Sequence, residues 1–271
     1  MPTGTGGQWR AYLTGEPTDL ARLQRELSTG AVTVAEDDSG TYLQADEFEV
    51  CADADEVRAA ADPLVVLLNG MASLSFGGHR RIALNGTIAR GESKYLFLED
   101  SFRLSDELSV VRIVADITAE GVVTTVDGTV PDSPGLSSMQ RRLASIATHP
   151  ELADVYRLLG RKDPAWDELY KAYELLSKAV GGEQKLPKRT GVARDRIQLL
   201  KDNSNNPELT GDDARHAVPT KDARGSEQIT LAEGLAIIDE LIQRYAQFDP
   251  ERRLSMAYAA NDAERAKQDA A

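Results

Sequence analysis

The chain has 271 residues and a formal net charge of −13, with 41% hydrophobic and 28% charged residues. This length suffices for one large domain or two ordinary ones, and the composition is that of a folded soluble protein. The acidic balance argues against broad, sequence-independent binding to nucleic acid or to an anionic membrane, although it leaves room for a local basic patch.

The single cysteine, Cys51, excludes an intrachain disulfide and fits a reducing compartment. The segment Met1–Gly7 lacks the basic and apolar regions of a signal peptide. The longest apolar run, around 63–68, is too short to span a bilayer. We therefore expect a cytoplasmic protein that does not enter the membrane, and the Ala- and Arg-rich style is compatible with a bacterial source.

The first quarter of the chain predicts one short helix and several strands. Residues 19–27 carry leucines at helical spacing, whereas 31–35 and 41–43 have the composition of strands. The intervening Asp37–Gly40 is typical of a hairpin loop. Residues 48–51 are expected to extend the sheet.

A longer helix is predicted from Asp53 to Met71. Asp53 and Glu56 form a capping box, and the apolar residues that follow recur at helical spacing. Pro63 lies inside the pattern, so we expect a kink or a break at that position.

Four further segments are rich in alternating or β-branched residues and are expected to be strands: 80–89, 95–99, 110–117 and 122–126. The Pro- and Gly-rich stretch Pro131–Gly135 then marks a domain boundary. Beyond it the periodicity is helical, with helices expected near 137–147, 148–160, 163–180, 197–201 and 230–248.

These patterns predict an α+β protein in two domains. The N-terminal domain, 8–133, is expected to be mainly antiparallel β with a central helix, and the domain at 136–250 is expected to be all-α. Residues 251–271 form a charged tail. The sequence contains no phosphate-binding loop and no Cys or His pair at metal-ligand spacing, so it predicts no cofactor and no metal.

The stretch Gly211–Ala217 holds the best candidate for chemistry, because Arg215 and His216 are adjacent in it. Histidine could act as general base or acid in metal-independent RNA cleavage, while arginine stabilises the charge of the transition state. The structural alternative is that Asp212 or Asp213 pairs with Arg215 and that His216 packs under the last helix.

Five basic residues precede this stretch and could contact phosphates: Lys185, Lys188, Arg189, Arg194 and Arg196. A second Arg–His pair, Arg142 and His149, has a ribonuclease-like spacing that often arises by chance. His79 lies beside a Gly-Gly turn and is expected to be exposed. The aromatic stripe Trp166, Tyr170 and Tyr173 is expected to be core.

The order of Trp166–Glu174, Gly211–Ala217 and Thr230–Leu235 resembles that of bacterial two-domain proteins of about this size that have no assigned activity. More remotely, an Arg/His element followed by a loop and a final amphipathic helix resembles the end of HEPN domains. That resemblance implies an all-helical, often dimeric domain with a role in RNA cleavage or binding. In HEPN nucleases an arginine lies four to six residues before the histidine, whereas Arg215 and His216 are adjacent.

We therefore expect a non-catalytic interaction or sensing protein, an accessory component of a bacterial defence or stress system. The competing hypothesis is a HEPN-like, metal-independent ribonuclease that uses Arg215 and His216. A third is a ligand-binding N-terminal domain, in which the sheet faces the helix at 53–71. The expected partner is another protein or a second copy of the chain, with RNA contact only through the basic residues at 185–196.

Overall fold

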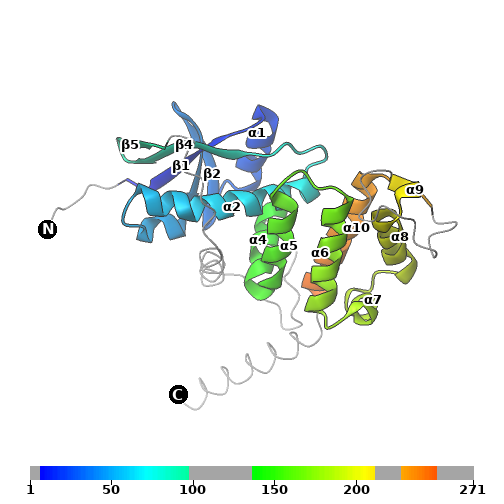
Figure 1. Ribbon diagram of the computed structural model, residues 1–271. Helices are drawn as coiled ribbons and strands as arrows, with labels where there is room; N and C mark the ends of the chain where they lie inside the picture. Colours follow the sequence, from blue (N-terminus) through cyan, green and yellow to red (C-terminus); the bar gives the residue numbers. More distant parts are fainter. Residues whose placement is uncertain (1–6, 98–135, 211–226, 249–271) are drawn as a thin grey trace, which may run out of the picture. The chain divides into compact units, whose positions relative to one another are not determined.

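The computed structural model describes residues 7–97, 136–210 and 227–248 (Figure 1). The chain divides into two compact units. Among the described residues, the first unit contains 7–97 and 137–168, and the second contains 136, 169–210 and 227–248. The expected α+β architecture is confirmed, because the N-terminal unit carries an antiparallel sheet and the chain then becomes helical.

In the part of the chain that the structure describes, the sheet of the first unit has five antiparallel strands in the order β2-β3-β1-β4-β5. Its strands are β1 (Trp9–Thr14), β2 (Val32–Asp37), β3 (Gly40–Ala45), β4 (Ala83–Arg90) and β5 (Ser93–Leu96). The predicted β2–β3 hairpin is confirmed, since Asp37 pairs with Gly40. Gly40 has a φ of 122°, a conformation that glycine adopts without strain.

Among its described residues, the same unit contains the helices α1 (Pro17–Glu26), α2 (Ala54–Ser75), α4 (Ser138–Thr148) and α5 (Glu151–Gly160). The capping box of α2 is confirmed, because the Asp53 side chain accepts a bond from the Glu56 backbone N–H and Glu56 accepts one from that of Ala52. Pro63 does not break the helix. Burial of residues on both sides of Pro63 holds the two turns in one helix.

The strand expected at 48–51 is wrong, because a short 3-10 helix, η1 (Asp46–Val50), occupies this position. Helix α2 is long and apolar enough to cross a membrane, yet 61% of its most apolar window is buried within the protein. The buried core helix of a soluble protein has the same composition.

Helices α2 and α5 approach each other through two glycines, and α5 crosses α2 (Figure 1). A Cβ on Gly70 would lie 1.8 Å from the carbonyl oxygen of Tyr156, and a Cβ on Gly160 would lie 1.8 Å from that of Val66. Backbone therefore packs directly on backbone at this crossing. Helices α4 and α5 belong to the same compact unit as the sheet.

A second seam joins the end of α1 to the start of α4. The Ser137 hydroxyl donates to the backbone carbonyl of Glu26, and the Met139 N–H donates to the Glu26 carboxylate at 3.1 Å. Gln140 Nε2 donates to the Thr29 carbonyl at 2.7 Å. Carbonyls at the end of one helix and N–H groups at the start of the other are thus satisfied together.

The second unit is helical in its described residues: most of α6 (Trp166–Ala179), then η3 (Glu183–Lys185), α7 (Leu186–Thr190), α8 (Arg194–Asn205), α9 (Pro207–Thr210) and α10 (Leu231–Phe248). The predicted capping box of α10 is confirmed, with Thr230 Oγ1 accepting from the Glu233 N–H at 3.2 Å. The apolar stripe of α10 is buried from Ile237 to Tyr245, whereas Leu231 and Leu235 at its start are partly buried.

Replacing Gly70 by alanine should destabilise the protein by more than about 3 kcal/mol, because the new methyl group can be placed only if the helices separate. Alanine in an unhindered helix interior would instead stabilise by up to about 1 kcal/mol. Urea unfolding measures the difference. Gly77→Ala is the control, because its Cβ would meet nothing within 4 Å. A neutral Gly70→Ala would contradict the close approach.

Candidate functional site

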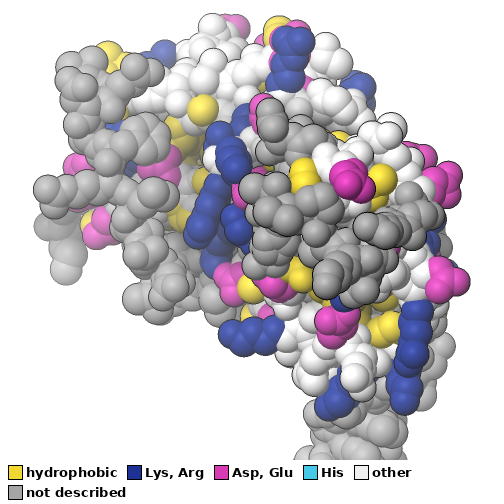
Figure 2. Space-filling view, turned by 45° about the vertical axis from the view of Figure 1, so that its right-hand side comes forward, with side chains coloured by type: hydrophobic (Ala, Val, Ile, Leu, Met, Phe, Trp, Pro, Cys, Tyr) yellow, Lys and Arg dark blue, Asp and Glu magenta, His cyan; other side chains and the backbone are white. Residues whose placement is uncertain are grey.

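His79 is buried, which corrects the expectation that it is exposed. Its side chain is 2% exposed, and Figure 2 shows no histidine side chain on the described part of the face it presents. The segment between α2 and β4 folds back so that the ring packs edge-on to Phe76, with 6.1 Å between ring centroids. The Gly77–Gly78 turn is exposed, whereas the imidazole that follows points inward.

Asn69 of α2 holds the segment between α2 and β4 through hydrogen bonds to Ile82 and His79. Its Nδ2 donates to the Ile82 carbonyl and its Oδ1 accepts from the Ile82 N–H, both at 2.9 Å. This pair of hydrogen bonds sets the orientation of the Asn69 amide, because a flipped amide would place its NH2 group against the Ile82 N–H. Asn69 Oδ1 also lies 3.0 Å from His79 Nε2. The hydrogen on the ring therefore sits on Nε2.

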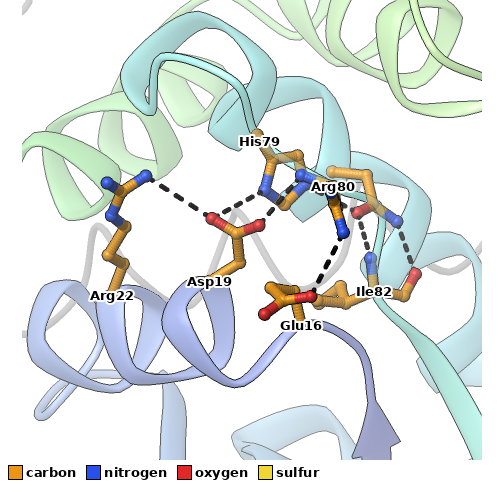
Figure 3. Close-up of polar contacts among 7 residues, drawn as sticks. Glu16, Asp19, Arg22, His79, Arg80 and Ile82 are labelled. Carbon is orange, nitrogen blue, oxygen red and sulfur yellow. Dashed lines mark hydrogen bonds and ion pairs between the residues drawn. The ribbon is translucent and has the colours of Figure 1, made fainter.

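Asp19 of α1 meets the other side of the ring (Figure 3). Its Oδ2 accepts from the Arg80 N–H at 2.9 Å. Its Oδ1 lies 3.8 Å from His79 Nδ1 and 3.5 Å from an Arg22 guanidinium nitrogen. His79 Nδ1 is buried without a hydrogen-bond partner. In the neutral ring, a nitrogen lone pair consequently faces the Asp19 carboxylate.

Burial lowers the pKa of His79 below its ordinary value of 6.5. The Asp19 and Asp163 carboxylates oppose this shift, and Arg22 adds to it. The ring is thus neutral at pH 7. Because Nε2 is bonded to Asn69 and Nδ1 is buried against Asp19, neither nitrogen is open to a substrate, and His79 acts as a positioning residue.

Above this network lies a groove, which we call the Arg22 groove. It consists of two adjoining depressions of about 260 and 290 Å³ that share Arg22 and Gly77. The first is also lined by Glu16, Asp19 and Arg80, and the second by Arg25, Glu26, Ser75, Phe76 and Ser138. All of these residues belong to the first unit.

The carboxylates of the groove already have protein donors. Asp19 accepts from the Arg80 N–H, Glu26 accepts from the Met139 N–H, and Glu16 accepts from the Arg80 side chain at 3.4 Å. By contrast, Arg25 is exposed and makes no ion pair with any described residue. The groove thus presents cationic donors in a chain of net charge −13.

Arg22 connects the two depressions. Its guanidinium carbon lies 5.8 Å from the centre of the Phe76 ring, and its side chain is 36% exposed. The aromatic face holds the guanidinium in place while leaving part of it open to solvent.

The candidate residues Arg215 and His216 lie outside the described residues. The described residues on either side of 211–226 bond to Asn203 of α8, which is 0% exposed. Asn203 Nδ2 donates to the Glu227 carbonyl at 2.9 Å, and its Oδ1 accepts from the Ile229 N–H at 3.0 Å. On the other side of the segment, the Thr210 hydroxyl donates to the Asn203 carbonyl at 2.9 Å.

The five basic residues predicted to contact phosphates lie on consecutive elements, η3, α7 and the first turn of α8. Four of them are exposed, and Arg189 is half-buried: the exposed ones are Lys185, Lys188, Arg194 and Arg196. Arg196 Nε is paired with Glu240 at 2.7 Å. Arg194 lies roughly 14 Å along α8 from Asn203, at a helical rise of about 1.5 Å per residue.

The second Arg–His pair is part of the packing of the first unit. Arg142 is 7% exposed and its Nε donates to the Ser75 hydroxyl at 2.9 Å. His149 is 4% exposed, with its Nδ1 2.8 Å from the Thr148 hydroxyl. Burial keeps both residues away from an RNA phosphate.

Comparisons of the chain with protein-family models, with curated proteins and with solved structures each found no match. Within the part of the chain that the structure describes, no three His, Cys, Asp or Glu residues are grouped to hold a metal ion.

Replacing Asn69 by alanine should lower the free energy of unfolding by on the order of 3 kcal/mol, because it leaves the buried Ile82 N–H and carbonyl unpaired. Urea unfolding of the variant tests this. Asn85→Ala is the matched control, since the single bond that Asn85 accepts from Thr87 N is exposed. Equal effects of the two substitutions would contradict the role given to Asn69.

The stability contributed by neutral His79 should decrease with acidification. Because the folded-state pKa is lowered, the unfolded chain binds the proton more tightly, so stability is lost as pH falls from about 6.5 to the folded pKa. In His79→Gln this component is absent, and the difference in unfolding free energy between wild type and variant should shrink over that range. A constant difference from about pH 8 to about pH 5 would contradict the shift.

Proposed function

We propose that this protein is a non-catalytic sensing protein whose first unit binds a small anionic ligand, a phosphate or sulfate ester or a carboxylate, in the Arg22 groove. The observation that carries the proposal is the charge arrangement of the groove. Its carboxylates accept bonds from protein N–H groups, while Arg25 has no ion pair among the described residues and Arg22 is open to solvent.

The donors around the groove suit an anion with several oxygens. Guanidinium groups bind such oxygens in pairs, and Ser138 lines the same depression as Arg25. The Phe76 ring holds Arg22, and Asn69 holds the segment that follows the Gly77–Gly78 turn, which lines the groove. Little conformational entropy would be lost when a ligand binds to groups that are already held.

Binding is favoured over acid–base catalysis at this site by the state of His79. A general base must come within hydrogen-bond reach of the proton that it removes. Both ring nitrogens of His79 face protein groups, and the side chain is 2% exposed. The network therefore shapes the groove, and the arginines contact the ligand.

The proposal predicts that inorganic sulfate stabilises the protein at constant ionic strength. Arg22→Gln and Arg25→Gln should each weaken sulfate binding by about 10- to 150-fold, since one charge-assisted hydrogen bond contributes about 1.5–3 kcal/mol. Isothermal titration calorimetry measures the affinity. Arg161→Gln is the control, because it removes an exposed arginine of the same unit that does not line the groove. Absence of sulfate binding, or an equal effect of all three substitutions, would overturn the proposal.

A ribonuclease centred on Arg215 and His216 is a second candidate, favoured because Asn203 bonds to the described residues on both sides of 211–226, Thr210 and Glu227. Catalytic residues are often carried by loops whose ends are fixed on rigid elements. Cleavage of structured RNA in EDTA that is lost in Arg215→Ala/His216→Ala would support this function. If wild type and variant both leave the RNA intact, the second candidate fails and the first is unaffected.

A further inference from the structure

We propose that protonation of His79 controls the Arg22 groove, by releasing Arg22 from Asp19 so that it can bind the anion. This inference rests on the function proposed above and names its regulation. Anion binding should accordingly tighten as the pH falls, and anion binding should in turn favour protonation of His79.

The geometry limits the titration to one atom. Asn69 Oδ1 already accepts the hydrogen of His79 Nε2, so an added proton can go only to Nδ1. Nδ1 faces Asp19 and has no hydrogen-bond partner. Protonation would turn this contact from a lone pair facing a carboxylate into a hydrogen-bonded ion pair.

The two cations would share one oxygen. Arg22 and His79 both face Oδ1 of Asp19, at 3.5 and 3.8 Å, while Oδ2 is occupied by the Arg80 N–H. With His79 neutral, Oδ1 attracts the Arg22 guanidinium. With His79 charged, the carboxylate is neutralised from the other side, and the attraction of Arg22 to Asp19 weakens.

No other described group around the His79 ring takes the place of Asp19 as the shared partner of His79 and Arg22. Phe76 and Asn69 carry no charge, and Arg80 contributes its backbone N–H to Asp19 while its side chain reaches Glu16. Asp163, in the connection between α5 and α6, favours the charged ring through space. Asp19 is thus the carboxylate that contacts both His79 and the groove.

Linkage makes the effect reciprocal. If protonation of His79 raises the affinity for the anion by some factor, the bound anion raises the proton affinity of His79 by the same factor. Couplings of this kind are typically about 5- to 150-fold. Sulfate is the suitable probe, because its own charge does not change over the range in which histidine titrates.

The test is an NMR titration of the His79 ring with and without sulfate at constant ionic strength, with the signal assigned by its loss in His79→Gln. We expect sulfate to raise the pKa of His79 and sulfate affinity to rise at least fivefold from about pH 8 to about pH 5.5. In His79→Gln, which retains a donor toward Asn69, affinity should not change with pH. In Asp19→Asn, affinity should be high at both pH values.

The outcomes separate the two proposals. If sulfate binds in the groove with the same affinity at both pH values and leaves the pKa of His79 unchanged, the regulation is overturned and the anion site stands. If no sulfate binds, the proposed function fails. The release of Arg22 is then still read from its side-chain Nε–H signal, which should titrate together with His79, and a signal that does not respond overturns the release as well.

Discussion

The first unit depends on the direct contact of backbone with backbone where α2 crosses α5. Gly70 and Gly160 leave no room for a side chain between the helices. The crossing fixes the axial position of α2, and Asn69, the neighbour of Gly70, therefore has a fixed height relative to the sheet. From there Asn69 holds Ile82 and His79, and these set the wall of the Arg22 groove. The packing of α2 against α5 thus determines the geometry of a polar site.

The groove also shows how an acidic chain can present a cationic surface. Asp19 and Glu26 are carboxylates, but each accepts a bond from a backbone N–H contributed by another segment. These bonds tie segments of the fold together and partly offset the negative charge of the two carboxylates. The Glu26 carboxylate lies at the start of α4, where the helix dipole favours an anion. The groups that the groove exposes to solvent are therefore mainly the guanidinium groups of its arginines. The net charge of the whole chain gives no sign of this local cationic surface.

Several features governed by neighbouring residues could be predicted from the sequence, although the strand expected at 48–51 is a 3-10 helix. The Asp37–Gly40 hairpin and the capping boxes at Asp53 and Thr230 involve residues a few positions apart, and all three are present. The burial of His79 could not be predicted, because it depends on Asn69 and Asp19. Asp19 bonds to the backbone of Arg80, the residue after His79, although the two are 61 positions apart in the sequence. Gly77–Gly78 correctly indicated a turn but not the direction of the next side chain. The candidates Arg215 and His216 lie outside the described residues.

The seam between α1 and α4 bears on how the protein is made. Its bonds connect residues 111 and 113 positions apart, so Glu26 leaves the ribosome long before Ser137 and Met139 can reach it. Until Gly160 has also emerged, the face of α2 that carries Gly70 has no helix to pack against, and the apolar residues of that face stay in water. The first unit therefore stays incomplete until 137–160 has been translated, a segment of the same unit that lies well beyond the sheet in the chain.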